Sequence, residues 1–61
     1  MIIRDKIEEY GLYFVEQDLP KTTFYEVYRN GEKLYQSKNN FDNALRVWCE
    51  TIQKYVPQKV S

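Results

Sequence analysis

A chain of 61 residues, 43% hydrophobic and 16% aromatic, can bury one small core and does not have the composition of a disordered tail. Nine basic residues balance nine acidic ones, and this neutral charge argues against a dedicated nucleic-acid-binding protein with a basic excess. Cys49 is the single cysteine, so no internal disulfide can form. The longest apolar run, Leu12–Val15, is too short to cross a membrane. We therefore expect one cytosolic domain spanning 1–61.

The N-terminal segment has the spacing of a short amphipathic helix. Ile3, Ile7 and Tyr10 follow one another at i, i+4 and i+7, with charged residues between them. Gly11 comes next and is suited to end a helix. These features predict a helix over residues 2–10, and the alternative is that the segment is a strand.

Three strands are predicted after Gly11, namely Leu12–Gln17, Thr22–Arg29 and Glu32–Ser37. Asp18–Lys21 forms the first turn, because its Pro20 has a fixed φ and no backbone N–H. Asn30-Gly31 forms the second, since both residues tolerate the positive φ angles of a type I′ hairpin. The pattern indicates a three-stranded antiparallel meander.

A second, longer helix is predicted after the polar segment Ser37–Asn40, which contains N-cap candidates. Pro57 ends it and leaves a frayed tail from Pro57 to Ser61. The fold class is therefore α+β, with a short N-terminal helix, the meander, and a long C-terminal helix packed on one sheet face. The apolar positions of the long helix are Phe41, Ala44, Leu45, Trp48, Ile52, Tyr55 and Val56.

The two turns set a strand register that divides the side chains between two faces. The Asn30-Gly31 turn pairs Arg29 with Glu32, Tyr28 with Lys33, Val27 with Leu34 and Glu26 with Tyr35. A four-residue loop at Asp18–Lys21 pairs Phe14 with Tyr25 and Leu12 with Val27. One face then forms the core under Leu45, Trp48 and Ile52, and its strand residues are Leu12, Phe14, Tyr25, Val27 and Leu34.

The opposite face mixes aromatic and charged side chains. Its aromatic pairs either stabilise the sheet across neighbouring strands or form an exposed patch that binds a partner. The candidate partner-binding residues are Tyr13, Phe24, Glu26, Tyr28, Lys33 and Tyr35.

Residues that carry common enzymatic chemistry are few. The absence of histidine removes the most frequent general base and metal ligand. Cys49 lies near Leu45 and Ile52 on the predicted helix, which favours a buried structural role. Gly11 and Gly31 are the only glycines, too few for a phosphate-binding loop. We expect no catalytic residues, no metal and no cofactor.

The predicted order of helix, three strands and helix over Ile2–Tyr55 resembles a double-stranded-RNA-binding domain, which implies recognition of RNA shape. That family opens its second helix with clustered lysines, whereas Ser37–Asp42 contains one lysine followed by an acid. The segment Phe24–Trp48 is similar to the strand-and-helix layout of integrase arm-binding domains, which implies DNA binding through a sheet.

The residues favour a non-enzymatic protein-binding module, a cytosolic regulator, inhibitor or accessory factor of phage or mobile-element origin. Its partner is another protein or a second copy, docked on the face around Tyr28 and Tyr35 or paired along the edge strand Glu32–Ser37. The alternative is stacking of single-stranded nucleic acid on the aromatic face, which the neutral charge disfavours.

Overall fold

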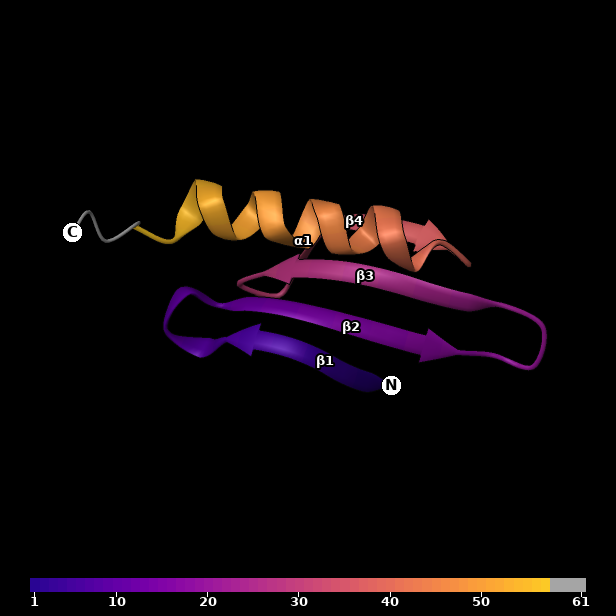
Figure 1. Cartoon of the computed structure of the whole chain (residues 1–61). Helices are drawn as coiled ribbons and strands as arrows, with labels where there is room; N and C mark the ends of the chain where they lie inside the picture. The colour runs from indigo at the N-terminus through magenta and orange to yellow at the C-terminus, as the bar shows by residue number, and fades with distance from the viewer. Residues whose placement is uncertain (58–61) are drawn as a thin grey trace.

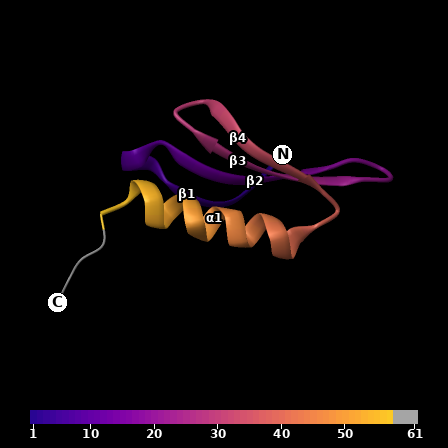
Figure 2. The ribbon, with the colours of Figure 1, turned by 90° about the horizontal axis from the view of Figure 1, so that it is seen from above.

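The computed structural model describes residues 1–57 and shows an antiparallel meander sheet with one helix packed on it (Figure 1). The strands follow chain order, β1-β2-β3-β4, and α1 lies along one face of the sheet (Figure 2). No described element covers the other face. The elements are β1 (Ile2–Ile7), the 3₁₀ turn η1 (Glu8–Tyr10), β2 (Leu12–Asp18), β3 (Thr23–Arg29), β4 (Glu32–Lys38) and α1 (Phe41–Tyr55).

The predicted N-terminal helix is wrong, because residues 2–7 form β1 and pair with β2. An isolated helix of this length is marginal, whereas the free edge of β2 offers backbone partners to the β-branched isoleucines. A bulge at Arg4 places Ile3 opposite Val15 and Ile7 opposite Leu12, so the two isoleucines lie on different faces. Without this helix, the topological resemblance to a double-stranded-RNA-binding domain is lost.

Gly11 does end a helical segment, as predicted, but only the single 3₁₀ turn η1. Its φ of 67° lies in the left-handed region, and its N–H donates to the Glu8 carbonyl at 3.0 Å. A side chain at this position would also collide with Asn30, because a Cβ would lie 2.1 Å from Asn30 Oδ1. Glycine is therefore required here both for backbone conformation and for space.

The β2–β3 register differs from the prediction by two residues and keeps the predicted faces. Phe14 lies opposite Val27, and Glu16 lies opposite Tyr25. Reciprocal backbone hydrogen bonds between Leu19 and Thr22 close the loop. They leave only Pro20 and Lys21 between them, where a four-residue loop, Asp18–Lys21, was expected. Because side chains alternate with a period of two, a shift of two residues leaves every side chain on its own face.

The β3–β4 hairpin starts as predicted and then departs from the predicted register. Asn30 and Gly31 have φ angles of 50° and 82°, and Arg29 and Tyr28 lie opposite Glu32 and Lys33. A bulge then leaves Leu34 without a cross-strand partner, so the predicted Val27–Leu34 and Glu26–Tyr35 pairs are wrong.

Beyond this bulge the faces of β4 are exchanged relative to the prediction. Tyr35 lies opposite Val27 and Gln36 opposite Glu26. Tyr35 packs against the core below α1 and its hydroxyl accepts a hydrogen bond from the Asn43 side chain. Leu34, 41% exposed, does not belong to the core as predicted. The tyrosine fits this position because its ring fills core space while its hydroxyl finds a polar partner on the helix.

The core lies between α1 and the sheet and centres on Trp48. The indole stacks on Phe14, with ring centroids 5.7 Å apart and an interplanar angle of 17°. Its Nε1–H donates to Asp5 Oδ2 at 3.0 Å, which joins α1 to β1. The residues buried in this cluster are Leu12, Phe14, Val27, Ala44 and Trp48.

Helix α1 begins and ends as predicted, but is rotated about its axis. Asn40 is the N-cap and its Oδ1 accepts from the Asn43 N–H at 3.0 Å. Small Ala44 approaches the sheet in line with Trp48, so Leu45 is 40% exposed and Cys49 is exposed. The predicted burial of these last two side chains is wrong.

In the part of the chain that the structure describes, no helix is long and apolar enough to span a membrane. Residues 58–61 of the predicted frayed tail lie outside the described residues.

Replacing Trp48 with alanine removes both the stack on Phe14 and the hydrogen bond to Asp5. We expect Trp48→Ala to lower the free energy of unfolding by about 3–5 kcal/mol, measured by urea denaturation followed by circular dichroism. Leu45→Ala, on the exposed side of the same helix, is the control and should cost less than about 1 kcal/mol. Equal losses in the two variants would show that Trp48 does not anchor the helix.

Because of the bulge, we expect contrasting effects on stability when lysine replaces each of two adjacent residues of β4. Leu34→Lys adds a charge to an exposed side chain and should change the free energy of unfolding by roughly 0.5 kcal/mol or less. Tyr35→Lys puts the same charge beneath α1 and should lose most of the folded signal in the same urea titration. A register without the bulge would bury Leu34 and expose Tyr35. A larger loss of stability in Leu34→Lys than in Tyr35→Lys would therefore contradict the bulge.

Candidate functional site

The sheet face opposite α1, called the open face below, brings together five of the six predicted site residues. Tyr13, Phe24, Glu26, Tyr28 and Lys33 all lie on it. Tyr35 does not, because the bulge at Leu34 turns it towards α1. The register arranges the side chains of the open face in three cross-strand rows. The first row is Lys6, Tyr13, Tyr28 and Lys33, and the second is Ile3, Val15, Glu26 and Gln36. The third row is Gln17, Phe24 and Lys38.

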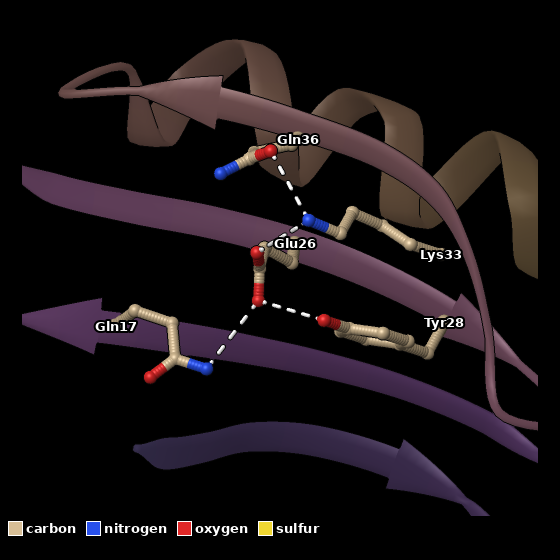
Figure 3. A network of polar contacts seen from close by, with 5 residues as sticks. All are labelled: Gln17, Glu26, Tyr28, Lys33 and Gln36. Atoms are coloured by element: carbon tan, nitrogen blue, oxygen red, sulfur yellow. Dashed lines mark hydrogen bonds and ion pairs between the residues drawn. The ribbon is translucent and has the colours of Figure 1, made fainter.

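Glu26 is the centre of a polar network on this face (Figure 3). The residue is only 5% exposed. Its Oε1 accepts from the Tyr28 hydroxyl at 3.0 Å and from Gln17 Nε2 at 3.4 Å, while Oε2 lies 3.2 Å from Lys33 Nζ. The ammonium of Lys33 also donates to Gln36 Oε1 at 3.2 Å. Three strands therefore contribute partners to one carboxylate.

The network decides the ionisation states at its centre. Burial by itself would raise the pKa of Glu26, but hydrogen bonds from Lys33, Tyr28 and Gln17 outweigh it and hold that pKa below its usual value. Burial raises the pKa of the Tyr28 hydroxyl, and its hydrogen bond to the Glu26 carboxylate raises it further. At neutral pH the face therefore presents a charged carboxylate and a neutral phenol.

The hydrogen bond to Glu26 also sets the orientation of the Tyr28 ring. Glu26 precedes Tyr28 by two residues on β3, so its carboxylate lies further along the same face. Tyr28 reaches it only when its ring lies along the strand, as Figure 3 shows.

A shallow apolar hollow lies beside this network, towards β1. It has a volume of about 340 Å³ and is lined by Met1, Ile3, Tyr13, Val15, Tyr28 and Gly31. Met1 and Ile3 on its rim are 79% and 49% exposed.

Met1 and Ile3 are not among the predicted site residues, because residues 2–10 were expected to form a helix. The signal that could have found them is the pair of adjacent β-branched residues, Ile2 and Ile3, which favours a strand.

Residues 1–57 contain no cluster of three or more His, Cys, Asp or Glu side chains placed to hold a metal ion. Cys49 is exposed on the helix and is not part of the open face.

Comparisons of the chain with protein-family models, with curated proteins and with solved structures give no significant match. The functional interpretation therefore depends on the geometry of the open face.

The low pKa of Glu26 predicts a pH-dependent contribution to stability. Because the folded-state pKa lies below the ordinary value of 4.5, ionised Glu26 stabilises the fold above that pH. This contribution is lost as the pH falls through the folded-state pKa. At neutral pH we expect Glu26→Gln to lower the free energy of unfolding by about 1–3 kcal/mol, since it weakens a buried charged hydrogen-bond centre.

Urea denaturation at a series of pH values measures this effect. The difference between wild type and Glu26→Gln should narrow as the medium becomes more acidic than the ordinary carboxyl pKa. Glu50→Gln, on the exposed surface of α1, is the matched control and should follow the wild-type curve. A difference that stays constant across the acid range would contradict the proposed ionisation of Glu26.

Proposed function

We propose that this chain is a non-enzymatic protein-binding module and that the open face is its docking surface. The observation that carries the proposal is the position of the apolar hollow, on a face that no described element covers, next to a preformed polar network. Folding has used the other face of the same sheet for the core. A partner that covers the hollow gains the burial that the chain itself does not provide.

The aromatic side chains of the open face supply contact area at low cost in conformational entropy. Tyr28 is already held along the sheet by Glu26, so it loses little freedom on binding. Tyr13 lies directly opposite it on β2, and both line the hollow. Ordered tyrosines at the centre of a surface are characteristic of binding hot spots.

The polar network supplies orientation. Glu26 is buried, but Lys33 keeps 42% of its side-chain area exposed and Gln36 is exposed. A partner can therefore reach the outer members of the network without disturbing its centre. Apolar contact in the middle and polar contact at the border is the usual anatomy of a protein interface. We propose that such a module acts in the cytosol as a regulator, inhibitor or accessory factor.

Site-specific photo-crosslinking tests the proposal even when the partner has not been identified. A photoreactive phenylalanine analogue at Tyr13 in the living source cell should form one discrete adduct with another protein. The same analogue at Gln53, on the exposed side of α1, is the matched control and should form none. Adding Tyr28→Ala to the Tyr13 probe should abolish the adduct while circular dichroism shows a retained fold.

The mass and composition of the adduct separate the competing partners. An adduct at twice the chain mass of 7.4 kDa would identify a second copy. A nuclease-sensitive adduct would identify single-stranded nucleic acid and overturn protein binding. Equal labelling from Tyr13 and Gln53, or none from a folded Tyr13 probe, would contradict a docking role for the open face.

A further inference from the structure

We infer that the open face binds an acidic protein segment, one that places an apolar side chain in the hollow and carboxylates on the surrounding lysines. This inference rests on the proposed function and names the chemistry of the partner. It comes from the distribution of charge between the two faces of the sheet.

The net charge of +0 conceals a charge difference between the faces. On the open face the strand residues include three lysines, Lys6, Lys33 and Lys38, and one carboxylate, Glu26. The strand residues on the helix side have the opposite balance, with two arginines and four acids. They are Arg4, Arg29, Asp5, Glu16, Asp18 and Glu32.

Two of the lysines flank the tyrosines that line the hollow. Lys6 and Lys33 end the cross-strand row that has Tyr13 and Tyr28 in the middle. Neighbouring strands are about 4.8 Å apart, so three intervals separate these two backbones by about 14 Å. An extended peptide rises about 3.3 Å per residue, and two carboxylates four residues apart therefore span a similar length. Such a segment can cross the strands with an apolar side chain above the tyrosines.

Each lysine has donor capacity for such a ligand. Lys33 Nζ lies against Glu26 and Gln36, which leaves one of its three ammonium protons for a partner. Lys6 pairs with Glu8 at 2.7 Å, but both side chains are exposed, and exposed pairs contribute little stability and exchange readily. Within residues 1–57, Lys38 makes no ion pair within salt-bridge distance.

The same charges disfavour binding of a second copy of the chain or of a nucleic acid to the open face. Two copies packed by their open faces would bring lysines against lysines, because Glu26 is buried and already engaged. A nucleic acid would gain little from releasing counterions, since the strands supply only three lysines to the open face and the net charge of the chain is +0. A peptide needs only a few carboxylates and derives the rest of its affinity from the hollow.

The experiment is a selection of short random peptides displayed against the immobilised wild-type chain. Enriched peptides should combine Asp or Glu with an aromatic or aliphatic residue. Against one enriched peptide, the double variant Lys6→Glu, Lys38→Glu should bind roughly tenfold more weakly, as expected for loss of charge-assisted contacts. Lys21→Glu, Lys54→Glu makes the same change in net charge away from the face and is the matched control, with unchanged affinity.

The failures of the two proposals are distinguishable. The acidic partner is overturned if the enriched peptides lack acids, or if they bind the Lys6→Glu, Lys38→Glu variant as tightly as the wild-type chain. If the binding of those peptides still depends on Tyr28, the proposal of protein docking stands. Peptide binding that survives both the charge reversal and Tyr28→Ala overturns both proposals. Lysine-dependent binding of an oligothymidine identifies nucleic acid, and a concentration-dependent doubling of mass that Tyr28→Ala abolishes identifies self-association. Either result overturns the acidic segment.

Discussion

The placement of α1 through Trp48 is the constraint on which the rest of the molecule depends. The indole stacks on Phe14 of β2 and donates a hydrogen bond to Asp5 of β1, so one side chain connects the helix to two strands. Residues 1–57 contain one α-helix for the two faces of the sheet. Because Trp48 holds that helix on one face, no element within residues 1–57 covers the other face of the same sheet.

The bulge at Leu34 then determines the chemistry of the open face. In a regular ladder Tyr35 would lie opposite Glu26, and the carboxylate would have an aromatic neighbour where it now has an amide. The extra residue sends Tyr35 into the core and places Gln36 beside Lys33. One irregularity in an edge strand therefore completes both the packing below the helix and the polar network above the sheet.

The sequence predicts what depends on local chemistry and fails where long-range pairing decides. Asn30-Gly31, the alternation in β2 and β3, and the stripe of α1 have local causes, and they place five of the six site residues on one face. The spacing of Ile3 and Ile7 fits a helix, but the edge of β2, which is distant in sequence, makes it a strand. Neither bulge has a signal in composition or periodicity, and each changes which side chains share a face.

The buried carboxylate of Glu26 is a second observation, beside the apolar hollow, that supports the proposed docking role of the open face. Desolvating a charge costs free energy, and replacing a buried ion pair with well-packed apolar residues is often neutral or stabilising. A face that served only to hold the sheet together would be better built from cross-strand apolar pairs. Here Gln17, Tyr28 and Lys33 surround one carboxylate, which fixes a tyrosine ring and an ammonium in defined positions. Preorganised groups of this kind would orient a partner whose apolar contacts lie in the neighbouring hollow.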